Sequence, residues 1–308
     1  MRKMAVIGLG HVGREVGYTI VTKGIADDLT LFDKSDKIAK AEQLDLQDAQ
    51  GQLTTHTNVA IQDYAQLQDT DVIIFSAGDI TALYDHAGDR LAELRVTSKI
   101  VEEVGPKIKA SGFNGIIIDI TNPCDVITTY LQDLTGLPKK QVFGTGTALD
   151  TLRMKRAVGE KLNVELTNVA GFNLGEHGET QFTAWSTVTV GGKPISVLAK
   201  ERNLDVNQLS EDARLGGWYI FNGKRYTSYG IATAAVTLAE AVFSDARVIR
   251  PVSNWNEELG ICIGQPAIVG REGIVATYPI TLPADEQALF QKSADTIKHN
   301  YGTLPSKS

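Results

Sequence analysis

The stretch Met4-Ala5-Val6-Ile7-Gly8-Leu9-Gly10-His11-Val12-Gly13 decides the fold of this chain. Its four leading apolar residues predict a buried strand, and the glycines that follow predict a tight turn into a helix over Val12–Thr22. In the pattern Gly8-x-Gly10-x-x-Gly13, the first glycine allows the turn, the second lets backbone approach a phosphate, and the third lets the helix pack closely on the strand. Because backbone N–H groups at a helix start attract anions, this unit is predicted to bind phosphate groups.

The alternation of strand and helix continues through the first half of the chain. Short β-branched runs predict strands over Met4–Ile7, Leu29–Phe32, Val59–Ile61, Val72–Ser76, Gly115–Ile120 and Val142–Phe143. Helical spacing of apolar residues predicts helices over Val12–Thr22, Ile38–Ala49, Arg90–Ser111 and Val126–Leu134. Strands and helices that alternate in this way form a doubly wound parallel sheet. We therefore expect an α/β fold with an N-terminal Rossmann domain over residues 1–144.

The rhythm of the pattern changes after about Gly144. Helices are predicted over Thr147–Leu162, Thr227–Phe243 and Pro283–His299, and hairpin strands over Thr187–Val190, Ala267–Val269 and Gly273–Ala276. No linker rich in Pro, Gly or Ser separates the two halves, so we expect them to pack tightly. Residues 145–308 are predicted to form a C-terminal mixed α+β domain.

Composition and charge narrow the choice of partners. The 308 residues are 43% hydrophobic and 22% charged, which is ordinary for a globular protein. A net charge of −7 argues against nucleic acid or an anionic membrane as partner, and no apolar run approaches the ~18 residues of a membrane span. Cys124 and Cys262 lie far apart without metal-ligand spacing. We therefore expect reduced thiols, no metal site and a cytoplasmic location.

Asp33 is a candidate partner for a dinucleotide. It follows the strand Leu29–Phe32 and lies twenty residues after Gly13, where a carboxylate can bind ribose hydroxyls. A carboxylate there repels a 2′-phosphate, which favours NAD over NADP. The alternative is an ordinary glycine-rich turn in which Asp33 is a helix N-cap. On the first interpretation, the cofactor residues are Gly8, Gly10, Gly13 and Asp33.

Gly175-Glu176-His177-Gly178 and Asp150-x-x-Arg153 are the candidates for chemistry. Flanking glycines let a ligand approach closely, and the His177 imidazole can act as acid and base. Asp150 and Arg153 share one face of a predicted helix, so Asp150 could orient the imidazole while Arg153 binds a carboxylate in a bidentate manner. Other interpretations are that His177 is a turn residue and Arg153 a solvated charge. Thr147-x-x-Asp150 also matches a capping box.

Two further positions follow the ends of predicted strands. Asn122 comes after Gly115–Ile120, at the edge where open α/β sheets bind ligands; it could contact a substrate oxygen, or it could be a turn residue before Pro123. The segment from Gly78 to Arg90 is long for a strand-to-helix connection, which indicates a lid. Arg90, at its far end, could polarise a carbonyl or be a first-turn helix charge.

Together these motifs resemble those of the L-lactate/malate dehydrogenase family over essentially the whole chain. The matching residues are Gly8-x-Gly10-x-x-Gly13, Asp33, Asn122-Pro123-x-Asp125-Val126, Gly144-Thr145-Gly146-Thr147-x-Leu149-Asp150-x-x-Arg153 and Gly175-Glu176-His177-Gly178. The resemblance implies an NAD-dependent oxidoreductase that transfers hydride between the nicotinamide and C2 of a 2-oxo or L-2-hydroxy acid. It also implies that residues 145–308 bind the substrate and that the protein is a homo-oligomer, most often a tetramer.

The resemblance implies a role for each candidate residue. His177 would exchange the hydroxyl proton, with Asp150 as its partner, and Arg90 would close on the carbonyl. The residues implied for substrate binding are Arg153, Asn122, Thr227 and Arg90. The residues implied for cofactor binding, besides the glycine motif and Asp33, are Gly78, Asn122 and Ile231.

The lid departs from the usual family pattern. Asp79–Asp89 contains no proline, is a few residues longer than usual, and carries no Lys or Arg to hold a second carboxylate, which disfavours malate as substrate. Ile80, Ala82, Leu83 and Tyr84 favour a medium or branched aliphatic side chain, as in L-2-hydroxyisocaproate dehydrogenases. Two alternatives stay open: an L-lactate dehydrogenase without allosteric activation, and a non-catalytic NAD-binding protein.

Overall fold

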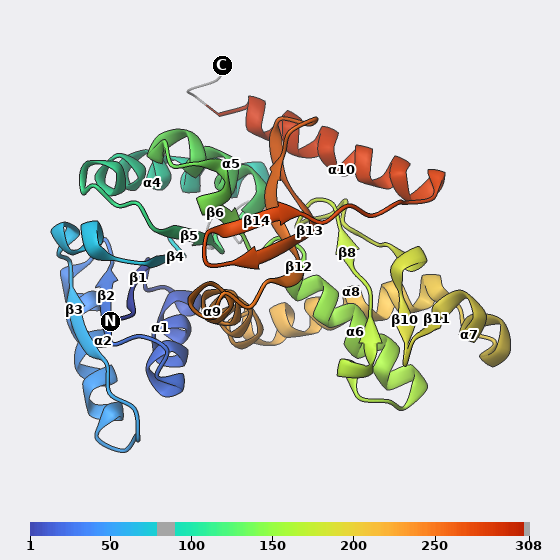
Figure 1. Ribbon diagram of the computed structural model, residues 1–308, viewed down its shortest axis with the longest axis horizontal. Helices are drawn as coiled ribbons and strands as arrows, with labels where there is room; N and C mark the ends of the chain where they lie inside the picture. Colours follow the sequence, from blue (N-terminus) through green and yellow to red (C-terminus); the bar gives the residue numbers. More distant parts are fainter. Residues whose placement is uncertain (79–89, 305–308) are drawn as a thin grey trace.

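A single mixed sheet forms the centre of the molecule (Figure 1), and within the described residues it has nine strands. The computed structural model describes residues 1–78 and 90–304. The sheet strands are β1 (Lys3–Ile7), β2 (Asp28–Phe32), β3 (Asn58–Ile61), β4 (Val72–Phe75), β5 (Ile116–Asp119), β6 (Val142–Gly144), β12 (Val248–Asn256), β13 (Ile261–Gly270) and β14 (Gly273–Thr277). The first six are parallel, in the order β3-β2-β1-β4-β5-β6. This order confirms the predicted Rossmann sheet.

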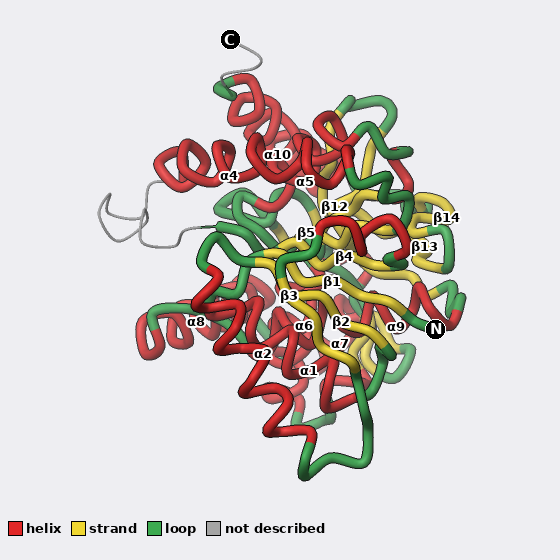
Figure 2. Tube along the Cα trace, turned by 90° about the vertical axis from the view of Figure 1, so that its left-hand side faces the viewer, coloured by secondary structure: helices red, strands yellow, loops and turns green. Residues whose placement is uncertain are grey.

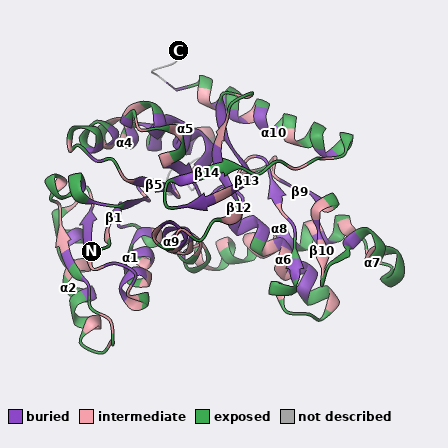
Figure 3. Cartoon of the chain, viewed as in Figure 1, coloured by how far each residue is buried: buried purple, intermediate pink, exposed green. Residues whose placement is uncertain are grey.

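Helices cover both faces of the parallel sheet, so the strands lie in a layer between them (Figure 2). The helices on the two faces are α1 (His11–Lys23), α2 (Asp36–Gln50) and α9 (Tyr229–Ser244), and α4 (Arg90–Ala110), α5 (Cys124–Thr135) and α10 (Ala284–Gly302). Val16, Leu46 and Ala235 contribute to the core on the first face, and Val101 and Ile127 to the core on the second. Figure 3 shows the central strands buried and the outer sides of α2 and α10 exposed.

The C-terminal half adds a smaller body built on α6 (Ala148–Leu162). The other elements are α7 (Ile195–Arg202), α8 (Val206–Lys224), β7 (Val169–Ala170), β8 (Asn173–Leu174), β9 (Phe182–Thr183), β10 (Thr189–Val190) and β11 (Lys193–Pro194). Short 3₁₀ helices span Tyr64–Asp69, Lys139–Gln141, Leu166–Asn168 and Trp185–Thr187. Met154, Val158, Ile195 and Leu209 form the core of this body. None of the described helices is long and apolar enough to cross a membrane.

The sheet does not end at the last parallel strand. Ser253 of β12 pairs with Gly144 of β6, and β13 and β14 continue the sheet in antiparallel fashion. The two halves of the chain therefore share one sheet, which accounts for the absence of a linker between them. The alternation that identifies a strand is interrupted in β12 by Arg250 and Pro251, so this strand was not predicted.

Two other elements differ from the sequence prediction. The adjacent glycines Gly216 and Gly217 conceal α8, because glycine weakens a helical pattern. Helix α9 begins at Tyr229, with Ser228 as its N-cap, so Thr227 lies in the turn before the helix and not inside it.

Candidate active site

The glycine-rich turn leaves room for a ligand at one glycine and packs tightly at the other two. Gly8 has a φ of +93°, and a Cβ there would lie 2.6 Å from the Ser76 carbonyl oxygen. A Cβ at Gly13 would lie 1.7 Å from the Gly8 oxygen, so α1 packs directly on the turn. At Gly10 a Cβ would meet no described atom within 4 Å, and no described side chain caps the start of α1. The first N–H groups of α1 and the open side of Gly10 fit a diphosphate.

Asp33 lies beside this turn. Its Oδ2 accepts a hydrogen bond from the Leu9 N–H at 2.9 Å, and its Oδ1 accepts one from Ser35 N–H at 2.9 Å. Ser35, not Asp33, is the N-cap of α2, and its hydroxyl accepts from Ile38 N–H. The N-cap interpretation of Asp33 is therefore wrong. A partly buried carboxylate next to the glycine turn fits the ribose of a dinucleotide.

Asp150, on the first turn of α6, joins His177 to Arg153. Its Oδ2 lies 2.6 Å from His177 Nδ1, and its Oδ1 accepts from Arg153 Nη1 at 2.9 Å. The Asp150 side chain is 3% exposed, against 19% for each partner. Burial acts to raise the pKa of Asp150, but the neighbouring His177 and Arg153 outweigh it and hold the pKa below its ordinary value. Asp150 is thus an ionised acceptor that can orient the imidazole.

The capping-box interpretation of Thr147 and Asp150 is also wrong. Thr147 is the N-cap residue of α6, but its side chain makes no capping bond within the described residues. Its Oγ1 donates instead to the Asn173 carbonyl oxygen at 2.7 Å. This bond ties the start of α6 to β8, and β8 leads directly into the loop that carries His177.

The Gly175–Gly178 loop is held against β13 and α10. Gly175 has a φ of +92°, and a Cβ there would lie 2.3 Å from Ser293 Oγ on α10. Gly175 and Gly264 exchange backbone hydrogen bonds of 2.9 and 3.0 Å. A side chain at Gly175 would displace the loop, so glycine is needed here for close packing as well as for its positive φ.

Asp125 is a candidate functional residue that the sequence interpretation missed. Its Oδ2 accepts the His177 backbone N–H at 2.7 Å, and its Oδ1 accepts the Ser253 hydroxyl at 2.5 Å. Burial raises the pKa of Asp125 to about 6. Asp125 therefore fixes the backbone that carries the imidazole. The available signal was its place in Asn122-Pro123-x-Asp125, three residues after a residue that was selected.

The remaining candidates lie around this centre. Asn122 lies between β5 and α5, in a cis peptide with Pro123. A Cβ at Gly78 would lie 3.2 Å from Thr121 Cγ2, so the end of β4 adjoins Asn122. Thr227 and Ile231 flank the start of α9, which packs on α6, because a Cβ at Gly230 would lie 3.0 Å from Leu149 Cδ1.

Arg153 has a second neighbour that its sequence motif does not reveal. A Cβ at Gly217 of α8 would lie 3.0 Å from Arg153 Cζ, so glycine makes room for the guanidinium. Arg153 Nε is buried and has no hydrogen-bond partner among the described residues. The expected lid, Asp79–Asp89, lies outside the described residues, and Arg90 is described only as the first residue of α4.

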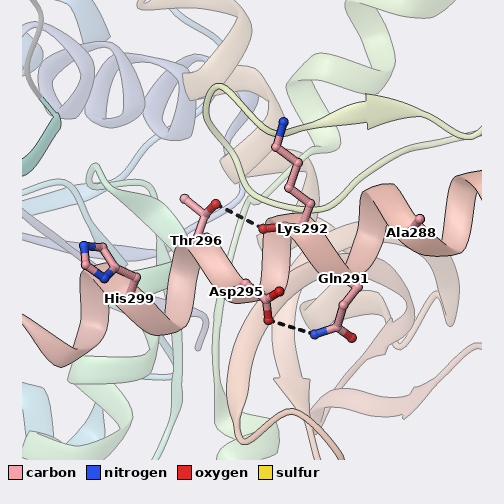
Figure 4. Close-up of a pocket in the computed structure, with 6 residues that line it drawn as sticks. All are labelled: Ala288, Gln291, Lys292, Asp295, Thr296 and His299. Carbon is pink, nitrogen blue, oxygen red and sulfur yellow. Dashed lines mark hydrogen bonds between the residues drawn. The ribbon is translucent and has the colours of Figure 1, made fainter.

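A shallow hollow of about 520 Å³ on α10 is unrelated to this centre. Figure 4 shows its lining residues, Ala288, Gln291, Lys292, Asp295, Thr296 and His299, along one helix. Gln291 donates to Asp295, and Thr296 donates to the Lys292 carbonyl, so these groups bond along the helix and not toward a common point. Among the described residues, no three His, Cys, Asp or Glu side chains gather to hold a metal ion.

The strand order and the glycine-rich turn define a dinucleotide-binding protein, and the charges around Asp150 suit an oxidoreductase. Two family models match the chain: lactate/malate dehydrogenase, NAD binding domain, over residues 2–144, and lactate/malate dehydrogenase, alpha/beta C-terminal domain, over residues 147–305. The chain therefore belongs to the lactate/malate dehydrogenase family, as its motifs predicted. It is an oxidoreductase of that family, and its cofactor is NAD.

Individual relatives agree with this assignment. The chain is 37% identical to L-lactate dehydrogenase 3 of Bacillus cereus, over 98% of each protein. It is also similar to the crystal structure of a minor L-lactate dehydrogenase from Enterococcus mundtii in the ligands-bound form, with 31% identity, a TM-score of 0.93 and 98% of each chain covered. A malate dehydrogenase structure from Cryptosporidium parvum gives a TM-score of 0.91 at 26% identity, with 99% and 100% covered. Overall shape therefore does not distinguish the substrates.

Proposed function

We propose that this protein interconverts 2-oxo acids and L-2-hydroxy acids with NAD as hydride carrier. The observation that carries the proposal is the buried Asp150 carboxylate, which binds His177 through one oxygen and Arg153 through the other. An acid–base group and a carboxylate-binding group are thereby fixed relative to each other, as reaction at C2 of a 2-oxo acid requires. Residues 1–144 would hold the cofactor, and residues 145–308 the substrate.

The proton transfer falls to His177. Asp150 accepts the hydrogen bond of Nδ1–H, which fixes the tautomer and the direction of the ring. In reduction, His177 donates a proton to the carbonyl oxygen; in oxidation, it removes the proton of the hydroxyl group. Asp125 holds the His177 backbone in place during both. The bound cofactor supplies or accepts the hydride at C2.

Substrate orientation falls to Arg153, helped by neighbouring polar groups. Its planar guanidinium can bind the substrate carboxylate through two parallel hydrogen bonds, which a lysine cannot do. The buried Arg153 Nε supports this role, because a buried donor without a partner favours a ligand that satisfies it. Asn122 and Thr227 would contact the rest of the substrate, and Arg90 would polarise the carbonyl. Gly78, Asn122 and Ile231 would contact the cofactor.

We propose a medium or branched aliphatic side chain for the substrate, as in L-2-hydroxyisocaproate. Support comes from the apolar residues Ile80, Ala82, Leu83 and Tyr84 and from the absence of Lys and Arg between residues 79 and 89. The second candidate is L-lactate, which is favoured by the names of the relatives. The protein would act as a homotetramer in the cytoplasm, where reduced thiols such as Cys124 and Cys262 persist.

The substitution His177→Asn tests the proposal. Loss of general acid–base catalysis should lower kcat for oxo-acid reduction by about 10²–10⁴-fold. The Kd for NADH should not change, because the cofactor residues lie in the first half. His299→Asn on the exposed side of α10 is the matched control and should leave kcat unchanged. If the His177 variant keeps wild-type kcat, the proposed role is wrong. If the wild type binds NADH but reduces no 2-oxo acid, the protein is a non-catalytic NAD-binding protein.

A further inference from the structure

An aromatic stack joins the cofactor turn to the substrate-binding half. His11 is the first residue of α1, directly after Gly10, and its ring stacks on Tyr226 with centroids 3.8 Å apart and planes 4° apart. Tyr226 lies in the turn between α8 and α9, directly before Thr227. The two rings therefore belong to different halves of the chain, and each is adjacent in sequence to a proposed ligand-binding residue.

The turn that carries Tyr226 has a fixed shape. Arg225 has a φ of +69°, and its N–H donates to the Phe221 carbonyl at 2.6 Å, which ends α8. Lys224 Nζ donates to the buried hydroxyl of Ser228 at 3.1 Å and lies 3.9 Å from the centre of the Tyr229 ring. Tyr226 is thus held on both sides, and it cannot easily follow a movement of His11 by local rotation alone.

The turn that carries His11 is fixed by Arg14. Its Nε donates to the Gly10 carbonyl at 3.2 Å, and its guanidinium also pairs with Glu42 at 3.6 Å. Burial, followed by the positive charges of Arg14 and Lys224, lowers the pKa of His11. Near neutral pH the His11 ring is therefore uncharged, and it stacks on Tyr226 as one neutral aromatic ring on another.

We propose that the His11–Tyr226 stack couples cofactor binding to substrate binding. A diphosphate that fixes the Gly10–His11 turn would thereby also fix Tyr226 and the neighbouring Thr227. His11 and Tyr226 act as positioning residues and need touch neither ligand. The substrate side of this inference rests on the proposed function, whereas its cofactor side depends only on NAD binding.

A double-mutant cycle on NADH affinity tests the coupling. His11→Ala, Tyr226→Ala and the double variant are titrated with NADH, and the Kd of each is measured by fluorescence. We expect Tyr226→Ala to raise the Kd roughly three- to tenfold, although Tyr226 lies in the substrate half. Tyr226→Ala should have no further effect in the His11→Ala background, because the stack is already lost. Equal effects in both backgrounds, or a Kd within twofold of wild type, would overturn the proposal.

Conservative variants separate coupling from a purely structural role. His11→Phe and Tyr226→Phe keep both rings and should restore the wild-type Kd. With a 2-oxo acid as substrate, His11→Ala should raise KM by a similar factor with kcat within about twofold of wild type. Phe variants that behave like the Ala variants would contradict the inference. If the wild type reduces no 2-oxo acid, the proposed function fails, but the NADH cycle still decides whether the stack couples the two halves.

Discussion

Three buried aspartates differ because their neighbours differ. The pKa of Asp150 lies below its ordinary value, because the charges beside it overcome burial. Asp125 accepts one hydroxyl and one backbone donor, and burial raises its pKa to about 6. Asp119 accepts only from the Thr121 N–H and the Thr128 hydroxyl among the described residues, and burial raises its pKa to about 8. The nature of the hydrogen-bond donors decides which carboxyl group is ionised.

Asp119→Asn should change how stability depends on pH. In the unfolded chain an aspartate ionises near pH ~4, whereas folded Asp119 keeps its proton up to about pH 8. Between these values only the unfolded state releases the proton, so wild-type stability falls as pH rises. Asparagine does not titrate and can donate to Thr128. The Tm of the variant relative to wild type should therefore increase from pH 5 to pH 8, by at least roughly 2–4 °C.

The exposed carboxylate of Asp295 on α10 provides a control for this measurement. Asp295→Asn removes the same charge at a position that is not buried. Its Tm relative to wild type should stay nearly constant over the same pH range. A constant difference for Asp119→Asn as well would mean that Asp119 is ionised in the folded protein.

At the residue scale, the sequence motifs predicted which side chains would be brought together but not how they are held. The helical spacing of Asp150 and Arg153 placed them on one face, and the structure has them in contact. The contact with His177 spans 27 positions in sequence and was implied only by the family resemblance. Asp125 and Ser253 are separated by 128 positions, so no local pattern could connect them. Long-range polar contacts depend on the sheet order.

At the level of elements, α8 has an unusual arrangement of glycines. Gly216 and Gly217 face two arginines of α6: a Cβ at Gly216 would lie 1.9 Å from Arg156 Nη2, and one at Gly217 would lie 3.0 Å from Arg153 Cζ. Glycines lower the helical propensity of α8, but they allow it to pack closely on α6. The same pair explains why α8 was not predicted from sequence.

Gly217→Ala should weaken substrate binding. The added methyl group would push the Arg153 guanidinium away from its position, so KM for a 2-oxo acid should increase several-fold and the Kd for NADH should stay constant. Gly223→Ala, in the same helix, is the matched control, because a Cβ there would meet nothing within 4 Å among the described residues. That control should keep KM and gain roughly 0.5–1 kcal/mol of stability. An unchanged KM for Gly217→Ala would show that Arg153 does not depend on this space.

The strands and helices of the first half were predicted almost completely, because each buried strand is a continuous apolar run. In the second half, β12 contains polar residues and a proline, and α8 contains adjacent glycines, so local patterns were weak. These elements are stabilised by tertiary contacts instead, such as the pairing of Ser253 with Gly144. Sequence thus predicted the cofactor half better than the substrate half.

At the scale of the whole molecule, the account expects a homotetramer. A chain of 33.3 kDa would give a particle of about 133 kDa, four times that mass. Sedimentation equilibrium at micromolar concentration measures this directly. A mass near that of one chain would contradict the expectation, and a mass near twice that value would support a dimer.

Substrate preference tests the central claim most directly. NADH oxidation is followed with 2-oxoisocaproate, pyruvate and oxaloacetate under the same conditions, and kcat/KM is compared. Each further buried methylene favours binding by roughly 0.8 kcal/mol, so 2-oxoisocaproate should exceed pyruvate by about one to two orders of magnitude. Oxaloacetate should be poor, because its second carboxylate would lack a cationic partner. A higher kcat/KM for pyruvate would identify an L-lactate dehydrogenase, and oxaloacetate as the best substrate would contradict the account.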